Sequence, residues 1–262
     1  MADSACLYQP DWTLPAGVHA FVTTRCGGSS TAPWSSFNLG QHTGDLLSAV
    51  TANRHLLLAR LQKETGDTVP GIQWVQQVHG TRVFHAGATT LTPAPEADAL
   101  YAGDSPLALG VLTADCLPVL FCSNDGREIA VAHAGWRGLL TGVLEATLGS
   151  FHAPVSAISV WLGPAIGPCH FEVGNEVRVA YLARADVAQR AATEAAFVTT
   201  AIPGKWLADL YHLARIRLRM SGVQRITGSP VCTVCHHERF YSYRKQPVTG
   251  RFATLIVKIG RY

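Results

Sequence analysis

The sequence predicts a mixed α/β fold, in which helices cover a central mixed β-sheet within a single domain. Three observations predict this fold. Several short apolar runs are nearly continuous, which is typical of strands that are buried on both faces of a sheet. Longer segments between them place apolar residues at helical spacing. The chain of 262 residues is 48% hydrophobic, which is enough for one substantial core without disulfides or other staples.

In the first third of the chain, β-branched runs alternate with loops and one long periodic segment. The predicted elements are a strand over residues 18–24, a loop over 29–43, a helix over 46–62, a strand over 72–78 and its hairpin partner over 83–85. The helix is predicted because Val50, Leu57, Leu58 and Leu61 fall on one face. A Pro- and Thr-rich loop over residues 89–96 then precedes the next strands.

The rest of the chain holds the most apolar strands. The predicted strands cover residues 107–113, 117–122, 129–133, 158–162, 223–227 and 253–259, and the predicted helices cover 138–150, 173–184 and 206–220. In the last helix, Leu207, Leu210, Ala214 and Leu218 share a face, and the arginines beside them fall mainly on its solvated side. A Gly- and Pro-rich loop covers residues 163–169.

Charge and apolar patterning argue against several classes of function. The net charge is +3, from 21 Lys and Arg against 18 Asp and Glu, and no block of like charges marks a nucleic-acid-binding surface. No uncharged apolar run reaches the roughly 18 residues of a membrane span, and the N-terminus lacks the pattern of a signal peptide. We therefore expect a cytoplasmic protein that binds neither nucleic acid nor membrane. The sequence leaves its oligomeric state open.

Three side chains that commonly bind metals stand at the ends of predicted strands. His79 follows one strand, Cys116 lies between two others, and His133 ends a fourth. Two nitrogen ligands and one sulfur ligand would leave a zinc ion one open position, which is the pattern of a catalytic rather than a structural site. Such an ion makes water a nucleophile near neutral pH. Because the intervals of 37 and 17 residues match no short metal motif, the pattern alone supports only a hypothesis.

Eight short motifs, in order along the chain, resemble those of the YfiH family, whose members are also called laccase-domain, polyphenol oxidase or purine nucleoside phosphorylase proteins. They are Thr-Thr-Arg-Cys-Gly-Gly (23–28), Phe-Asn-Leu-Gly (37–40), Gln-Val-His-Gly (77–80), Thr-Ala-Asp-Cys-Leu-Pro-Val-Leu (113–120), Ala-His-Ala-Gly-Trp-Arg-Gly (132–138), Gly-Pro-Ala-Ile-Gly-Pro-Cys (163–169), Cys-Thr-Val-Cys (232–235) and Tyr-Ser-Tyr-Arg-Lys (241–245). The resemblance runs from about residue 18 to residue 258. One departure is Ala214, where the family usually has Asn before an Arg.

The resemblance implies a fold, a metal site and an activity. The fold is one α/β domain over residues 1–262 around a mixed sheet, and the metal ligands fall on His79, Cys116 and His133. The implied metal is zinc, with copper as the less favoured alternative. The implied activity is phosphorolysis of adenosine, inosine, guanosine and methylthioadenosine to the base and ribose 1-phosphate, with adenosine deamination as a second activity. The implied partners are therefore purine nucleosides and phosphate.

Four further residues are expected to serve this chemistry. Arg25 follows a strand and precedes two glycines, so its guanidinium and the exposed backbone N–H groups would form a phosphate clamp, although an ordinary turn arginine explains it equally well. Arg137 is a second candidate of the same kind. Asn38, in one of the motifs, is the third residue expected to bind substrate or phosphate. Asp115 would orient a metal ligand or accept a proton, or merely cap a turn.

Rival interpretations use the same side chains. Cys116 and His133 would form the nucleophile and base of a metal-free hydrolase, which would suit the peptidoglycan precursor editing linked to some family members. Two His and one Cys also suit copper, but the 11 histidines form no His-x-His pair of the kind that a multicopper polyphenol oxidase needs. A binding module without enzymatic activity is the remaining class.

A second group of motif-like residues lies near the C-terminus. Cys-Thr-Val-Cys-His at 232–236 matches the c-type haem attachment pattern, which the missing export signal disfavours. Cys232 and Cys235 would otherwise bind structural zinc with one of the two histidines that follow. Together with His-Phe-Glu at 170–172, they also echo the nucleobase-deaminase signature, with an extra residue and a long gap. A buried pair near the active site is the interpretation that the sequence alone favours.

Overall fold

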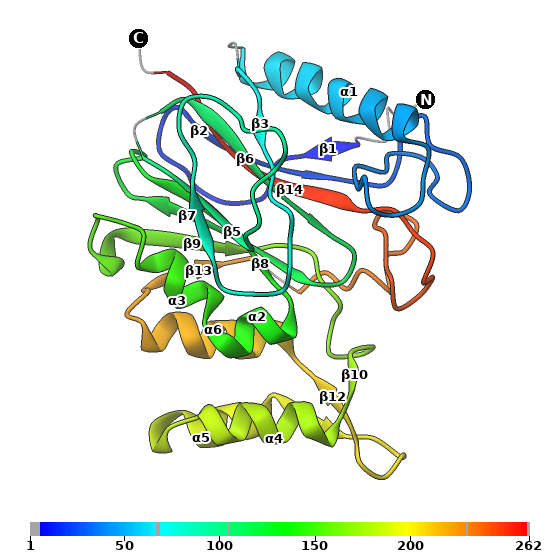
Figure 1. The fold of residues 1–262 in the computed structure, drawn as a ribbon. Helices are drawn as coiled ribbons and strands as arrows, with labels where there is room; N and C mark the ends of the chain where they lie inside the picture. The colour runs from blue at the N-terminus through cyan, green and yellow to red at the C-terminus, as the bar shows by residue number, and fades with distance from the viewer. Residues whose placement is uncertain (1–5, 67–68, 104, 229, 261–262) are drawn as a thin grey trace.

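The computed structural model describes residues 6–66, 69–103, 105–228 and 230–260 (Figure 1). In these residues the strands form two large mixed sheets and one small sheet. The five-stranded sheet has the order β1 (Leu7–Tyr8), β2 (Val18–Thr23), β14 (Phe252–Lys258), β6 (Leu107–Thr113) and β3 (Ile72–Gln73). The six-stranded sheet has the order β13 (Arg225–Thr227), β9 (Ile158–Leu162), β7 (Leu117–Ser123), β8 (Ile129–Ala134), β5 (Ala99–Ala102) and β4 (Val83–His85). Most neighbouring strands are antiparallel, but β3 is parallel to β6, β4 to β5 and β13 to β9.

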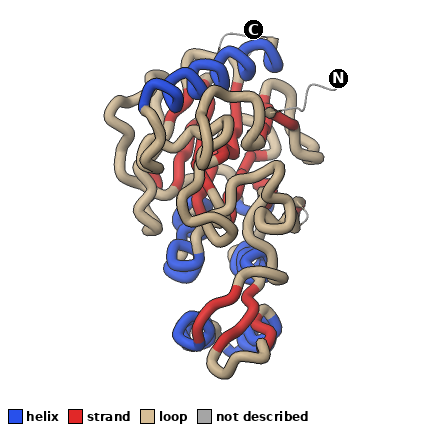
Figure 2. Tube along the Cα trace, turned by 90° about the vertical axis from the view of Figure 1, so that its right-hand side faces the viewer, coloured by secondary structure: helices blue, strands red, loops and turns tan. Residues whose placement is uncertain are grey.

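The two large sheets face each other and enclose the central core, to which Val111 of β6 and Leu120 of β7 both belong. Helices cover the outer faces: α1 (Leu47–Thr65) lies on the five-stranded sheet, and α2 (Trp136–Thr141), α3 (Val143–Leu148) and α6 (Leu210–Met220) lie on the six-stranded sheet (Figures 1 and 2). Leu57 and Leu61 of α1 are fully buried in the cluster under that helix. The arrangement therefore has four layers: helix, sheet, sheet and helices.

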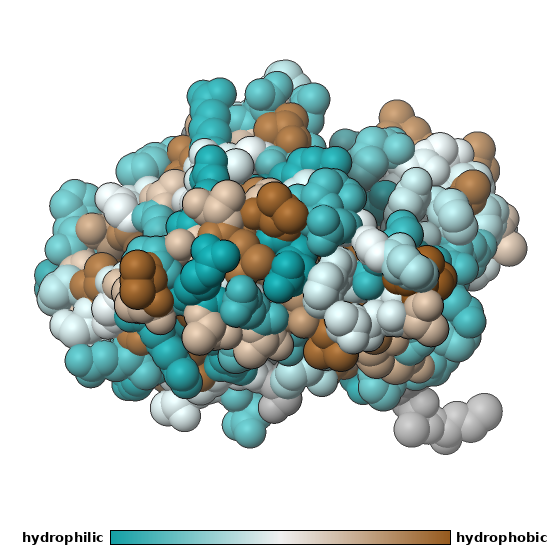
Figure 3. Space-filling view, turned by 90° about the horizontal axis from the view of Figure 1, so that it is seen from below, coloured by the Kyte–Doolittle hydropathy of each residue, from teal (hydrophilic) through white to brown (hydrophobic). Residues whose placement is uncertain are grey.

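A smaller unit extends from the helical side of the six-stranded sheet (Figure 2). It consists of β10 (Glu172–Gly174), α4 (Asn175–Arg184), α5 (Val187–Ala195), β11 (Phe197–Thr199) and β12 (Lys205–Ala208). Seen from this end, hydrophobic side chains are scattered among hydrophilic ones (Figure 3). Val179, Val187, Val198 and Ile202 of this unit are exposed. Across the described ranges, no helix is both long and apolar enough to cross a membrane.

The mixed α/β class predicted from the sequence is confirmed. The strands predicted over residues 107–113, 117–122 and 158–162 are present within one residue at each end, and every residue in them is buried. Their continuous apolar runs are thus explained by burial on both faces. The strands divide between two sheets, because the chain crosses from β6 of one sheet to β7 of the other within residues 114–116.

Three predicted helices differ from the structure for local reasons. The helix predicted over 138–150 is broken at Gly142, whose φ of 110° interrupts it between α2 and α3. The helix predicted over 206–220 begins only at Leu210, because Asp209 caps it by accepting a hydrogen bond from the His212 N–H at 2.9 Å. The first residues of that prediction, and of the one over 173–184, belong to β12 and β10 of the small sheet.

The hairpin predicted between residues 72–78 and 83–85 is wrong. β3 ends at Gln73, and β4 pairs with β5 in the other sheet. Side chains replace the expected strand ladder over the following residues. The Gln77 amide exchanges two hydrogen bonds with the backbone of Leu112, at 2.8 and 2.9 Å. The N–H groups of residues 78–80 all donate to the carboxylate of Asp98.

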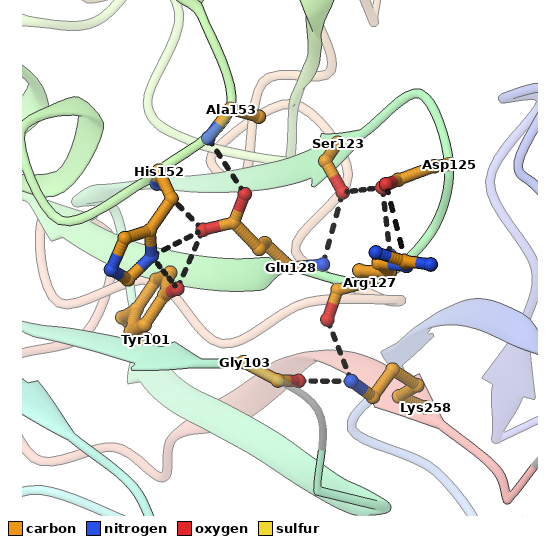
Figure 4. Close-up of polar contacts among 9 residues, drawn as sticks. All are labelled: Tyr101, Gly103, Ser123, Asp125, Arg127, Glu128, His152, Ala153 and Lys258. Atoms are coloured by element: carbon orange, nitrogen blue, oxygen red, sulfur yellow. Dashed lines mark hydrogen bonds and ion pairs between the residues drawn. The ribbon is translucent and has the colours of Figure 1, made fainter.

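A lysine joins the two large sheets at the end of β14 (Figure 4). The ammonium group of Lys258 donates to the carbonyl oxygens of Gly103 and Arg127. Gly103 directly follows β5, and Arg127 lies in the turn that leads into β8, so both acceptors flank strands of the six-stranded sheet. Lys258 is only 8% exposed, and these carbonyl dipoles compensate the burial of its charge.

A buried carboxylate beside this contact fixes the turn before β9 to the sheet (Figure 4). Glu128 accepts hydrogen bonds from the Tyr101 hydroxyl at 2.6 Å and from the N–H groups of His152 and Ala153 at 2.7 and 2.8 Å. Burial alone would raise the pKa of Glu128, but these donors outweigh burial and lower it. The side chain is therefore held in its ionised form.

Glu128→Ala is expected to lower the free energy of unfolding by about 2 kcal/mol, because the part-buried N–H groups of residues 152 and 153 lose their acceptor. Urea unfolding at neutral pH measures this change, with the exposed Glu64→Ala as the matched control. Since the folded-state pKa is lowered, the stabilisation is present above about pH 4.3 and is lost as the pH falls. The difference between variant and wild type should therefore shrink on acidification, and equal stability at neutral pH would contradict this role.

Candidate metal and active site

The three predicted metal ligands lie together near the point where the chain passes from the five-stranded sheet to the six-stranded sheet. Cys116 lies in the crossing from β6 to β7, His133 lies in β8, and His79 follows the short strand β3. One donor atom from each of the three lies within 4.8 Å of the other two. His133 is buried, Cys116 is half-buried and His79 is exposed. The group is therefore shielded from solvent at His133, on the sheet, and open to solvent at His79.

The distances within the group suit binding to one metal ion. Cys116 Sγ lies 3.9 Å from His79 Nε2. Sulfur and nitrogen atoms that share a tetrahedral zinc ion lie roughly 3.6 Å apart, given the usual bond lengths. The rings of His79 and His133 have centroids 4.8 Å apart and stand at 78° to each other.

Asp98, which the sequence reasoning missed, organises the two histidines. Its Oδ1 lies 2.9 Å from His133 Nδ1 and accepts a hydrogen bond from the His79 N–H at 2.9 Å. Its Oδ2 accepts from the N–H groups of Gly80 at 2.6 Å and Val78 at 3.2 Å. These bonds fix the backbone of His79 at a φ of 61°, an unusual value for a residue other than Gly. The bond to Nδ1 leaves Nε2 of His133 to face a metal ion if one binds, as in carboxylate–histidine–zinc arrangements.

The sequence carried only a weak signal for Asp98. It is an acidic residue directly before the apolar strand β5, and it is fully buried. A buried carboxylate requires several partners. Its partners come from residues 78–80 and from His133, which no local pattern connects to it.

Charges within the group favour the metal-binding form of the cysteine. Burial alone would raise the pKa of the Cys116 thiol, but His133 and His79 outweigh burial and lower it to about 6. Burial likewise would lower the pKa of His133, but Cys116 and Asp98 raise it to about 9. Near pH 7 the cysteine is therefore a thiolate, the form that binds metals and acts as a nucleophile.

Gly135 is needed for this arrangement. A Cβ at this position would lie 2.9 Å from Cδ2 of His79 and 3.1 Å from Sγ of Cys116. The backbone after His133 thus passes directly beside the other two ligands. This close approach explains the glycine in the Ala-His-Ala-Gly-Trp-Arg-Gly motif.

Asp115, predicted as a catalytic residue, holds a loop in place. Its Oδ1 accepts from the Thr233 hydroxyl at 2.6 Å and its Oδ2 accepts from the Arg244 N–H at 2.7 Å. Asp115 has a φ of 100° and is 9% exposed. Asp115, which directly precedes Cys116, thus holds the loop that contains Thr233 and Arg244 through its carboxylate. A direct catalytic role for Asp115 stays a prediction.

The predicted phosphate ligands Arg25 and Arg137 lie in different surroundings. Arg25 donates to the carbonyl oxygens of Ser35 at 3.1 Å and His237 at 2.9 Å, and stacks on Tyr241. These contacts match the alternative interpretation of Arg25 as a turn residue. Arg137 is exposed and lies over the ring of Trp136, with 4.3 Å to its centroid. Phosphate binding by either guanidinium stays a prediction.

Asn38 connects to an arginine whose charge interacts with Cys116. Asn38 is fully buried, its side-chain amide donates to Thr43 and Asp45, and its Oδ1 accepts from the Arg251 N–H at 2.9 Å. Any part in substrate binding would therefore act through the loop and through Arg251. Arg251 is half-buried, and burial lowers its pKa while the charges of Cys116 and Asp115 raise it. Arg251 lies outside the eight motifs, and no signal in the sequence assigned it a role.

Two further basic groups lie around Arg251. Burial, and then the charges of Arg251 and Arg54, lower the pKa of His42. His42 is thus neutral at pH 7, and the two guanidinium groups supply positive charge on this side of the site. Of these two guanidinium groups, Arg251 is the one whose charge interacts with Cys116.

Comparison with known proteins identifies the family. The family model described as "Multi-copper polyphenol oxidoreductase laccase" matches residues 19–259. A purine nucleoside phosphorylase of Pseudomonas aeruginosa is 48% identical over 247 residues, which cover 94% of this chain and 96% of the relative. The purine nucleoside phosphorylase YfiH of Escherichia coli is 45% identical over 254 residues, 95% of this chain and 98% of the relative. The chain belongs to the laccase-domain (YfiH) family. The resemblance drawn from the eight motifs is thereby confirmed.

Solved structures of YfiH-family proteins share this fold. A Neisseria meningitidis protein aligns with a TM-score of 0.87 and 41% identity, over 97% of this chain and 100% of its own. The protein YfiH of Bacillus licheniformis aligns with a TM-score of 0.85 and 28% identity, over 98% of each chain. The two large sheets with their helices are therefore the architecture of the family.

Proposed function

We propose that the chain is a zinc-dependent purine nucleoside phosphorylase. It would convert adenosine, inosine, guanosine and methylthioadenosine to the free base and ribose 1-phosphate, with adenosine deamination as a second activity. The observation that carries this proposal is the three-ligand group of His79, Cys116 and His133 in a chain whose relatives are named purine nucleoside phosphorylases. Three ligands leave one position open, as catalytic zinc sites do.

The donor set fits zinc. Cys116 is a thiolate near neutral pH, and the Asp98 carboxylate occupies Nδ1 of His133 and leaves Nε2 for the metal. Copper accepts the same three ligands. In the part of the chain that the structure describes, His, Cys, Asp and Glu form only one other such group, which has three cysteines and one histidine. A multicopper oxidase needs a histidine-rich cluster in addition, so this composition favours zinc and nucleoside chemistry.

The protein's own residues would bind and orient the reactants. Phosphorolysis forms a bond between a phosphate oxygen and C1′ of the ribose, breaks the bond from C1′ to the base nitrogen, and adds a proton to the departing base. Arg251 would hold the phosphate beside the metal ligands. A bound zinc ion would supply a Lewis acid at the reacting groups. Asp98 and the close approach of Gly135 keep the ligands in position.

The metal-free hydrolase is the second candidate, and the same charges favour it. Cys116 with a pKa of about 6 beside His133 with a pKa of about 9 forms a thiolate–imidazolium pair when no metal is bound. Such a pair would suit amide hydrolysis in peptidoglycan precursor editing. Zinc removal separates the two proposals, because a hydrolase of this kind would gain activity when a chelator strips the metal.

Inosine turnover by the zinc-replete protein is expected to require phosphate and to yield hypoxanthine and ribose 1-phosphate. The products are separated by chromatography after incubation with and without phosphate, and adenosine without phosphate is tested in parallel for inosine and ammonia. Cys116→Ala is the inactive control. Free ribose as the sugar product, formed at a rate that is indifferent to phosphate, would mean hydrolysis and would overturn the proposed phosphorolysis.

A further inference from the structure

A second group of metal-binding side chains lies beside the candidate active site. Cys169, His170, Cys232 and Cys235 each place one donor atom within 4.8 Å of the other three. Nδ1 of His170 lies 3.2 Å from Sγ of Cys169, 3.5 Å from Sγ of Cys235 and 3.7 Å from Sγ of Cys232. The sulfur atoms of Cys169 and Cys235 are 3.7 Å apart.

These four distances are close to those expected for edges of a tetrahedron of donors around one ion. With usual zinc bond lengths, two sulfur ligands lie roughly 3.8 Å apart and a sulfur and a nitrogen ligand roughly 3.6 Å apart. Four donors of this kind fill the coordination of zinc and leave no open position, which is typical of structural sites. The other group, with three ligands, differs in this respect.

Backbone contacts bring the two segments of the second group together. The loop after β9 and the segment after β13 are joined by a parallel bridge between Ala165 and Cys232. Gly167 allows Cys232 to approach closely, since a Cβ at residue 167 would lie 3.0 Å from Cβ of Cys232 and 3.4 Å from Sγ of both Cys169 and Cys232. The backbone N–H groups of Cys235, Gly167 and Val234 donate to the Cys232 sulfur. Such outer hydrogen bonds orient metal ligands.

We propose that Cys169, His170, Cys232 and Cys235 bind a second, structural zinc ion. Three thiolates, a neutral imidazole and one Zn²⁺ carry a net negative charge. The guanidinium of Arg244, which donates to the carbonyl oxygen of His170 at 3.0 Å, compensates that charge. The two histidines that follow Cys235 in sequence lie instead beside Glu238.

The second ion would fix the loop that contacts the candidate active site. Thr233, between two of the ligands, and Arg244 both donate to the carboxylate of Asp115. Asp115 directly precedes Cys116, the ligand of the first group. A closed site at Cys232 and Cys235 would therefore hold in place the segment that supports the first site.

Zinc stoichiometry of the full chain tests the proposal. The protein is purified under reducing conditions, saturated with zinc, dialysed and analysed by elemental mass spectrometry. We expect two zinc ions per chain in the wild type, one in Cys116→Ala, one in Cys235→Ser and none in the double variant. His170→Gln repeats the test with a variant that keeps every cysteine, and Cys26→Ser, outside both groups, should keep two ions.

Cobalt and thermal stability give readouts that do not depend on activity. In Cys116→Ala loaded with Co²⁺, thiolate-to-cobalt absorption should be present, and the added change Cys169→Ser should weaken it. Cys235→Ser should lower the Tm by about 5 °C or more, because it loses stabilisation by a bound ion, and Cys26→Ser should not.

Several results would overturn the second site. One is a wild type with a single zinc ion and a Cys116→Ala variant with none. Another is zinc that dialysis removes from Cys116→Ala. A third is a disulfide between Cys169 and Cys235 in the reduced preparation. Because these readouts concern metal content, a failure of the proposed phosphorylase activity would leave them unaffected.

Discussion

His133→Ala is expected to lose the metal bound by the group of His79, Cys116 and His133, and to lose nucleoside turnover, while still folding. The variant keeps two of three ligands, so zinc should be easily stripped. Turnover should fall by more than about 100-fold, since even the loss of an outer partner of a metal ligand typically costs 10- to 100-fold. The fold should persist because Asp98 keeps three backbone N–H donors and because the core around β8 is large.

The comparison for His133→Ala uses circular dichroism melting, zinc content and inosine turnover on the same preparation. The exposed His55→Ala on α1 is the matched control and should behave as the wild type. Near-normal turnover by His133→Ala would remove His133 from the site. A variant that is unfolded at room temperature would show that the residue is structural.

Asp98→Asn is expected to weaken zinc binding by about 10- to 100-fold, the usual effect of losing an outer partner of a metal ligand. In the wild type both carboxylate oxygens accept hydrogen bonds, from three backbone N–H groups and from the His133 ring. An amide offers one oxygen and places an N–H₂ group against these donors. The segment that carries His79 should also be less stable, by about 1–3 kcal/mol.

Zinc affinity is measured by competition with a chelator, and stability by urea unfolding, with the exposed Asp11→Asn as the control. Burial alone would raise the pKa of Asp98, but His133 and the backbone N–H groups lower it. The contribution of the carboxylate to stability is therefore present above about pH 3.9 and is lost as the pH falls. Wild-type zinc affinity in Asp98→Asn would show that Asp98 does not position the ligands.

The sequence predicted those elements whose residues carry a local pattern, and it failed for those that depend on contacts between distant residues. Strands β6, β7 and β9 were predicted closely because burial on both faces leaves continuous apolar runs. The hairpin of residues 72–85 failed because the Asp98 carboxylate, rather than a partner strand, binds the backbone of residues 78–80, while the Gln77 side chain binds the backbone of Leu112. Short elements such as α5 and β11 were missed because their apolar residues are few and partly exposed.

The candidate site was predicted where motifs mark it and missed where it depends on long-range contacts. The resemblance pointed to His79, Cys116 and His133, and the structure brings these three together. Asp98 belongs to no quoted motif, and its partners are distant in sequence. Cys169 and Cys235 lie in separate motifs, and a bridge between Ala165 and Cys232, distant in sequence, brings these segments side by side.

Anomalous X-ray diffraction at the zinc absorption edge, on crystals of the zinc-saturated protein, tests the central claim most directly. The account predicts a strong peak between His79, Cys116 and His133, about 2.0–2.1 Å from the Nε2 atoms and about 2.3 Å from the sulfur. The peak should be absent in crystals of Cys116→Ala. Wild-type crystals with no anomalous peak among these three side chains would contradict the account.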